Sequence, residues 1–132
     1  MNQLIIAIDF DGTIVEDKYP AIGAMQPKAQ SVIKSLKDRG DYIIIWTCRT
    51  GDHLLQAINW LVRHNIPFDA VNSHNPDNLA DFGGSPTKVY ADHYIDDKGL
   101  GGFPGWHHVE AHLIHGHRLT IEIGDKIINE FC

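Results

Sequence analysis

The sequence predicts a single α/β domain built on a mainly parallel, doubly wound sheet, and two observations support this fold class. Apolar runs that do not alternate with polar residues occur at residues 4–10 and 42–47, as is typical of strands buried on both faces. Between them, residues 27–39 repeat apolar side chains with helical spacing. A strand, a helix and a second strand in succession indicate the crossover unit of a parallel sheet.

The two helices expected in the first half of the chain have recognisable ends. The helix at residues 27–39 has Pro27 near its start and Gly40 just past its end, the positions that these residues favour. A second helix is expected at residues 52–64, followed by a short strand at residues 68–71. Each helix repeats apolar residues on one face, so both are expected to pack on the sheet.

The second half of the chain has fewer regular elements. Residues 72–87 are polar and contain two prolines, so we expect a loop with at most a helical turn around residues 77–82. A strand at residues 90–95, a helix at residues 107–115 and an edge strand at residues 118–123 are expected to follow.

Composition and charge exclude several classes of protein. The 132 residues fit one domain, residues 1–132, with no room for a second of similar size. The net charge of −6 comes without a basic stripe, so nucleic acid is not an expected partner. No apolar stretch approaches the ~18 residues of a membrane span, and no signal peptide is recognisable. Cys48 and Cys132 form no disulfide framework, so we expect a reduced, cytoplasmic compartment.

Chemically active residues stand where the expected strands end. Asp9 and Asp11 close the first strand, Thr47 closes the second, and Asp96 and Asp97 close a later one. The carboxyl ends of parallel strands meet at one edge of a sheet, where α/β proteins bind ligands. A functional site is therefore predicted at this edge.

Four of these features occur in an order that resembles a known family. Asp9-Phe10-Asp11-Gly12-Thr13 follows an apolar strand, Thr47 ends the next one, and Lys88 precedes the Asp96-Asp97 pair by eight residues. This pattern is similar to the motifs of the haloacid dehalogenase superfamily of phosphohydrolases, over about residues 4–97. The resemblance implies a Rossmann-like domain that hydrolyses a phosphate monoester through an aspartyl-phosphate. Because 35 residues separate Asp11 from Thr47 and 40 separate Thr47 from Lys88, we expect a member without a separate cap domain.

The resemblance also implies roles for individual residues. Asp9 would be the nucleophile, and Asp11 would protonate the leaving oxygen and then deprotonate water. Thr47 would donate its hydroxyl to a phosphoryl oxygen, and Lys88 would offset the charge of Asp9 and of the phosphoryl group. Gly12, where the chain turns, is also expected to contact the substrate.

The cofactor implied by the resemblance is Mg²⁺. Its expected ligands are the Asp9 carboxylate, the backbone carbonyl of Asp11, and Asp96, with Asp97 as a neighbouring or alternate ligand. Arg49 follows Thr47 by two residues and could contact a substrate phosphate or pair with Asp52.

Several alternatives stay open at this stage. The same fold could bind Mg²⁺ and phosphate without turnover. A phospho-receiver signalling domain is less favoured, because Asn72 stands where the acceptor aspartate would follow the third strand. The histidines between His107 and His117 could hold a metal, although an ordinary amphipathic helix explains their spacing. The expected substrate is a small phosphorylated molecule, selected by the loops at residues 14–26 and 72–87 or by a neighbouring subunit in a homo-oligomer.

Overall fold

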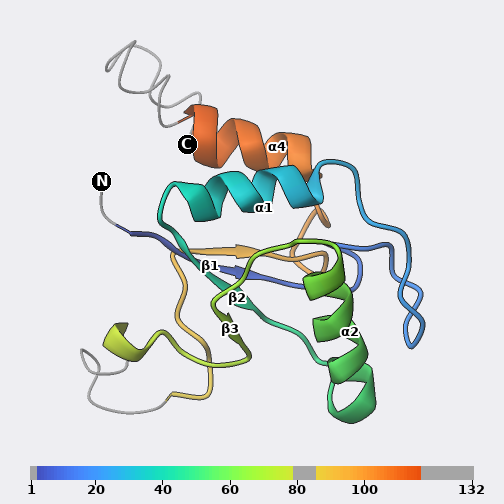
Figure 1. The fold of residues 1–132 in the computed structure, drawn as a ribbon. Helices are drawn as coiled ribbons and strands as arrows, with labels where there is room; N and C mark the ends of the chain where they lie inside the picture. Colours follow the sequence, from blue (N-terminus) through green and yellow to red (C-terminus); the bar gives the residue numbers. More distant parts are fainter. Residues whose placement is uncertain (1–2, 79–85, 117–132) are drawn as a thin grey trace.

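The computed structural model describes residues 3–78 and 86–116, and these contain a four-stranded sheet whose strands all run parallel (Figure 1). The spatial order is β3-β2-β1-β4, which reverses direction at β1 as in a doubly wound sheet. The predicted fold class is therefore confirmed as one α/β, Rossmann-like domain without a separate cap. The strands are β1 (Ile5–Ile8), β2 (Tyr42–Ile45), β3 (Ala70–Val71) and β4 (His93–Ile95).

The helices lie close to their predicted positions. They are α1 (Ala29–Asp38), α2 (Gly51–Arg63) and α4 (Trp106–Glu110), and the last of these continues as a π-helix over Ala111–Gly116. The prediction of a helix at residues 107–115 is therefore confirmed, and the structure adds that its second half is a π-helix. No described helix has the length and apolar character that crossing a membrane requires. The predicted strand at residues 118–123, His117, and part of the predicted turn at residues 77–82 lie outside the described residues.

The strands are shorter than predicted, and β1 shows why. Its apolar run continues to Phe10, but the Phe10 carbonyl accepts hydrogen bonds from the backbone N–H groups of Thr13, Ile14 and Val15. These bonds turn the chain away from the sheet before Phe10 can pair. Phe10 is fully buried, so its hydrophobicity reflects the core and not a strand.

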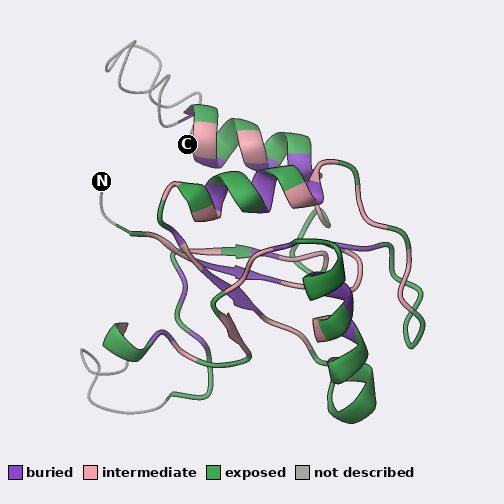
Figure 2. Cartoon of the chain, in the orientation of Figure 1, coloured by how far each residue is buried: buried purple, intermediate pink, exposed green. Residues whose placement is uncertain are grey.

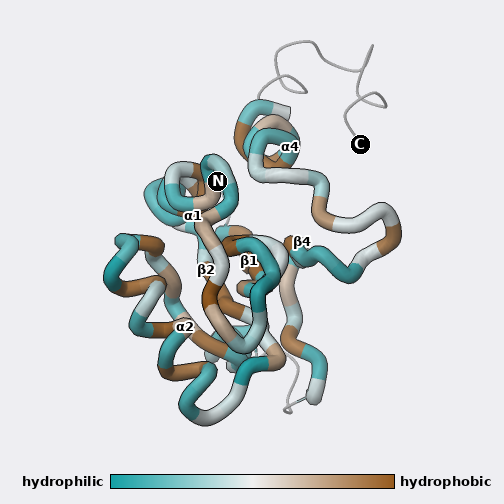
Figure 3. Tube along the Cα trace, turned by 90° about the vertical axis from the view of Figure 1, so that its right-hand side faces the viewer, coloured by the Kyte–Doolittle hydropathy of each residue, from teal (hydrophilic) through white to brown (hydrophobic). Residues whose placement is uncertain are grey.

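The two faces of the sheet are covered differently. Ile6 and Ile8 of β1 belong to a large core shared with α1, α2 and α4, whose buried residues line one side of each helix (Figure 2). Helix α2 alternates hydrophilic and hydrophobic residues along its turns, as expected for a helix with one apolar face (Figure 3). On the opposite face, Ala7 and Ile44 pack against Val89 and Ala91.

The register of the central strands determines which residues meet at the carboxyl edge. Ile8 of β1 pairs with Ile45 of β2 and with Ile95 of β4. Beyond these pairs, the Asp9 N–H donates to the Ile95 carbonyl at 2.9 Å, and the Trp46 N–H donates to the Ile8 carbonyl at 2.9 Å. The residues that follow β1, β2 and β4 therefore start side by side.

A hairpin of residues 15–25 connects this edge to α1, and we call it the 15–25 hairpin. It is closed by an antiparallel bridge between Val15 and Met25 and by the Glu16 N–H, which donates to the Ala24 carbonyl at 2.8 Å. Gly23 permits this close pairing, because a Cβ atom there would lie 2.3 Å from the Glu16 carbonyl oxygen. The 15–25 hairpin occupies the interval in which a larger protein could carry a cap.

Candidate active site

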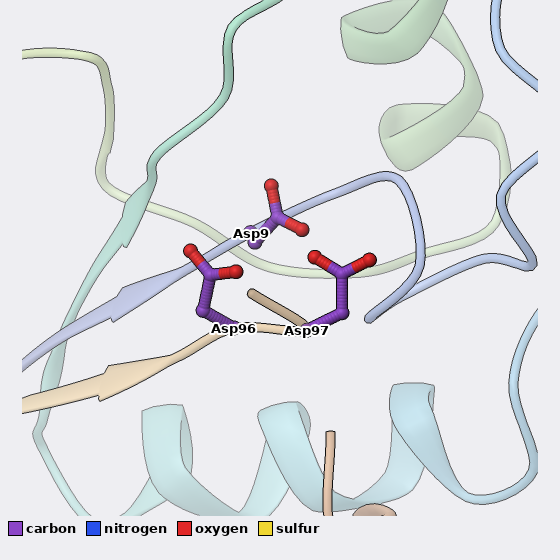
Figure 4. Close-up of side chains that lie close together, drawn as sticks. All are labelled: Asp9, Asp96 and Asp97. Atoms are coloured by element: carbon purple, nitrogen blue, oxygen red, sulfur yellow. The ribbon is translucent and has the colours of Figure 1, made fainter. Parts of the chain in front are cut away.

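Three carboxylates converge at the carboxyl edge of the sheet, and we call them the acid cluster. Asp9 follows β1, and Asp96 and Asp97 follow β4; one oxygen from each lies within 4.8 Å of the others (Figure 4). The cluster forms because β1 and β4 are hydrogen-bonded neighbours that end in register. The structure thus brings together three of the residues that the sequence predicted for the site.

The surroundings of Asp9 oppose its negative charge. Burial raises the pKa of Asp9 to about 7, and the charges of Asp96 and Asp97 act in the same direction. Thr13, itself fully buried, donates its hydroxyl to Asp9 Oδ2 at 3.1 Å and partly offsets this effect. Among the described residues, Lys98 forms an ion pair with the cluster: its Nζ lies 3.6 Å from Asp97 Oδ2, on a largely exposed side chain. Three oxygen ligands with so little compensating charge suit a hard divalent cation such as Mg²⁺.

Gly12 lies so close to the acid cluster that there is no room for a side chain at this position. Its φ angle is +85°, and a Cβ atom on it would lie 2.0 Å from Asp97 Oδ2. Any side chain at this position would therefore push the Asp97 carboxylate out of the cluster. The structure places Gly12 beside Asp97, and its expected contact with the substrate stays a prediction.

Arg49 has a partner that the sequence did not predict. Its guanidinium donates two hydrogen bonds to the Asp11 carboxylate, from Nε to Oδ2 at 2.7 Å and from Nη2 to Oδ1 at 2.7 Å. It does not pair with Asp52, and it is buried, with 1% of its side chain exposed. The chain turns after Thr47, so Arg49 lies under the 15–25 hairpin. There its guanidinium also donates to the carbonyls of Pro20 and Ala21. A substrate phosphate would have to displace existing partners to reach it.

Thr47 is held in place by a residue that the sequence analysis did not assign to the site. The side-chain amide of Asn72 accepts from the Thr47 N–H at 2.8 Å and donates to the Thr47 carbonyl at 2.9 Å. Asn72 follows β3 with a φ of +51°, a conformation that asparagine tolerates better than most residues. An asparagine directly after a short apolar strand was the available signal. The Thr47 hydroxyl accepts from the Arg49 N–H at 3.1 Å.

Lys88 lies beside an aromatic ring in this structure, and its expected role at the phosphoryl group stays a prediction. Among the described residues it makes no ion pair with Asp9 or any other acid; its Nζ lies 5.0 Å from the centre of the Tyr94 ring. Lys88 is exposed, whereas its neighbour Val89 is buried. It does line a cavity of about 480 Å³ together with Asp96, Trp46 and Lys98.

The histidines of the last helix do not form a comparable cluster. His108 and His112 stack with ring centres 6.3 Å apart, and His93 on β4 meets His112 edge-on at 6.4 Å. In residues 3–78 and 86–116, the acid cluster is the group of potential ligands that converges closely enough to hold a metal. Burial and the neighbouring His112 lower the pKa of His93, which favours its neutral form.

Comparison with a solved structure places the chain among its relatives. A conserved protein of Bacteroides thetaiotaomicron matches it with a TM-score of 0.76 and 33% sequence identity, over 99% of each chain. The two chains belong to one family. The description of the bacterial protein states no activity, ligand or partner. No protein-family model matches the chain, and no curated protein matches it.

Strand order distinguishes this family from one of the alternatives. Phospho-receiver domains have a flavodoxin-like sheet, in which the first strand lies between the second and the third. Here β1 lies between β2 and β4, and β3 lies beyond β2. In addition, β3 is followed by Asn72, which is engaged with Thr47. The strand order and Asn72 therefore argue against the receiver interpretation.

Proposed function

We propose that this protein is a Mg²⁺-dependent phosphatase of the haloacid dehalogenase type that hydrolyses a small phosphate monoester. The observation that carries the proposal is the convergence of Asp9, Asp96 and Asp97 within 4.8 Å, with Asp11 two residues after Asp9. The order and spacing of the sequence motifs support the same reaction.

In the proposed reaction Asp9 attacks and Asp11 transfers protons. Asp11 first takes up a proton from solvent. An Asp9 oxygen then forms a bond to phosphorus while the bond from phosphorus to the ester oxygen breaks, and the departing oxygen takes that proton from Asp11. Water then attacks the phosphorus of the aspartyl-phosphate as Asp11 takes one of its protons. Inorganic phosphate leaves, and both carboxylates return to their first state.

The acid cluster is the proposed site for the cation. Asp9, Asp96 and Asp97 would hold Mg²⁺, and the backbone carbonyl of Asp11 is a further candidate ligand. When bound, the ion offsets negative charge on the carboxylates and on the phosphoryl group. Thr47 would donate its hydroxyl to a phosphoryl oxygen. Lys88 would contact the substrate from the wall of the cavity that it lines together with Asp96.

The proposed substrate is a small molecule. The cavity beside Asp96 has a volume of about 480 Å³, within the range of small-molecule sites, roughly 300–1,000 Å³. Trp46 and Tyr94 give this cavity aromatic walls, and Lys88 and Lys98 give it positive charge. A second subunit that covers the cavity would be a proposed means of excluding water.

Phosphate release from 4-nitrophenyl phosphate tests the proposal. Wild-type protein is expected to release phosphate with Mg²⁺ and to lose this activity in excess chelator, with recovery when Mg²⁺ is restored. Asp9→Asn is the matched variant, because it keeps the shape of the side chain and removes the nucleophile; its kcat should fall by roughly 10³-fold or more. Full activity of the wild type in chelator, or of Asp9→Asn, would contradict the mechanism.

A module that binds Mg²⁺ and phosphate without turnover is the second candidate. Two observations favour it: Lys88 lies against Tyr94, and Arg49 already engages both oxygens of Asp11. For such a module, Mg²⁺ would raise the melting temperature while no phosphate is released from any of a panel of phosphorylated metabolites. Turnover of one member of the panel that depends on Asp9 would exclude it.

A further inference from the structure

The guanidinium of Arg49 has a complete set of hydrogen-bond acceptors. Its five N–H groups meet five oxygens. Two of these belong to the Asp11 carboxylate, and three are backbone carbonyls at 3.0–3.2 Å. Pro20 and Ala21 supply two of the carbonyls from the tip of the 15–25 hairpin, and His53 supplies the third from the first turn of α2. Arg49 thus connects the motif that carries Asp11 to a surface loop and to a helix.

Aromatic rings fix the plane of the same group. The guanidinium carbon lies 5.3 Å from the centre of the Phe10 ring and 5.0 Å from that of the Tyr19 ring. Phe10 belongs to the core and is fully buried, whereas Tyr19 belongs to the 15–25 hairpin and is 55% exposed. The rings stabilise the cation between them. The hydrogen bonds that Arg49 donates to Asp11 also raise the pKa of Arg49, so the group stays charged.

We propose that Arg49 is a positioning residue that orients the Asp11 carboxylate and fastens the tip of the 15–25 hairpin beside it. A guanidinium that meets a carboxylate through two parallel hydrogen bonds fixes both the direction and the plane of that carboxylate. The chemical part of this inference rests on the proposed function, because it takes Asp11 as the proton donor. When Asp11 carries a proton, one of its oxygens holds that proton and the other still accepts from Arg49. The mechanical part, the attachment of the hairpin, does not.

This arrangement couples the proton donor to the loop. If the tip of the 15–25 hairpin moves away, Arg49 loses the Pro20 and Ala21 carbonyls and the Tyr19 ring together. The guanidinium then has freedom to rotate, and the Asp11 carboxylate that it holds loses its fixed orientation. Proton transfer by Asp11 would therefore be efficient only while the hairpin is closed over Arg49.

Leaving-group dependence distinguishes positioning of Asp11 from a purely structural role. Phenyl phosphate and 4-nitrophenyl phosphate have nearly the same shape, but the nitrophenolate departs with far less need of a proton. The ratio kcat/KM is the quantity to measure, because it reports the first phosphoryl transfer and not the later hydrolysis. Arg49→Met should lower kcat/KM for phenyl phosphate about tenfold more than for 4-nitrophenyl phosphate. Arg49→Lys, which keeps the charge but not the two parallel bonds, should fall between.

Arg39→Met is the matched control. Arg39 forms a second Arg–Asp pair, with Asp41, at 2.9 Å and 2.6 Å, and it also donates to the Leu113 carbonyl. This pair lies between α1 and β2 and is no part of the site. Its loss should reduce stability and change kcat/KM for both substrates by one common factor.

Amide hydrogen exchange tests the hairpin without any activity assay. The N–H groups of Glu16 and Gln26 close the hairpin, with bonds of 2.8 Å each, and their exchange should be at least about tenfold faster in Arg49→Met than in Arg39→Met. If Arg49→Met fails to fold, Tyr19→Ala can replace it, because it removes the exposed ring that stacks on the guanidinium. It should change the ratio of kcat/KM for the two substrates and the amide exchange rates in the same direction as Arg49→Met, but by less. Equal losses on both substrates together with unchanged exchange would overturn the proposal. A wild-type protein inactive on both substrates would refute the phosphatase function, and the exchange result would then decide the hairpin attachment alone.

Discussion

Asp9 and Asp11 stand two residues apart in one motif, but their surroundings are opposite. Asp9 lies in the acid cluster, where burial and two further carboxylates raise its pKa to about 7. Asp11 faces Arg49, which donates two hydrogen bonds to it and is itself buried. The first carboxylate lacks a partner of opposite charge within the described residues, and the second has one supplied by the chain.

The acid cluster therefore has negative charge that a bound cation could neutralise, whereas the charges of Arg49 and Asp11 already neutralise each other. A cluster of acids without a countercharge destabilises the fold unless a cation joins it. A buried ion pair with good geometry needs nothing further, and it holds its members in place. The acid cluster should therefore respond to Mg²⁺, whereas the Arg49–Asp11 pair should respond to changes in the chain around it.

The largest expected effect comes from removing one charge from each region in the metal-free protein at pH 8. Asp11→Asn leaves the Arg49 guanidinium buried without its countercharge, so the free energy of unfolding should fall by about 3 kcal/mol. Asp9→Asn relieves repulsion in the acid cluster and keeps an acceptor for the Thr13 hydroxyl, so the same quantity should rise, by about 1 kcal/mol. Urea unfolding in chelator measures both. Two variants shifted in the same direction would show that the two carboxylates do not differ as described.

The sequence predicted the acid cluster well and the arginine pair poorly. Asp9, Asp96 and Asp97 could be placed together because strand ends are visible as the ends of apolar runs, and parallel strands share one edge. The partner of Arg49 could not, because it depends on how the 15–25 hairpin folds back over a residue 38 positions from Asp11. No periodic pattern encodes such a contact.

Lys88 and Asn72 show the same limit. The sequence places Lys88 eight residues before Asp96, but it does not predict that the Lys88 Nζ lies 5.0 Å from the centre of the Tyr94 ring. Asn72 was visible as a polar residue after β3, and its bonds to Thr47 require the register of β2 against β3. Element type and order follow from local pattern, whereas side-chain partners follow from packing.

A smaller effect is expected from pH in the absence of metal. The pKa of Asp9 is raised from 3.8 to about 7 on folding, so between these values the folded protein keeps a proton that the unfolded chain has lost. The contribution of Asp9 to the free energy of unfolding should therefore be largest near pH 4 and decline as pH rises to 7. The loss attributable to Asp9 is about 2 kcal/mol once solvent screening is allowed for.

The difference between wild type and Asp9→Asn isolates this contribution from other groups, such as Glu110, whose pKa is lowered by Lys28. The difference should grow from pH 4 to pH 7 in chelator and shrink when saturating Mg²⁺ is present. A difference that is constant over this range would mean that folding does not perturb Asp9.

The smallest expected change in stability, and the most specific test of the acid cluster, comes from Gly12→Ala. Gly12 has a φ of +85°, and the added Cβ would lie 2.0 Å from Asp97 Oδ2, so the variant combines backbone strain with displacement of a proposed ligand. Gly101 is the matched control: its φ is +89° and it has nothing within 4 Å of a built Cβ, so Gly101→Ala carries the strain alone.

Both variants should lose about 1 kcal/mol of stability. Titration calorimetry should show Mg²⁺ affinity reduced about tenfold in Gly12→Ala and unchanged in Gly101→Ala. Equal affinities would mean that Asp97 holds no ion, and the proposed metal site would then reduce to Asp9, Asp96 and the Asp11 carbonyl.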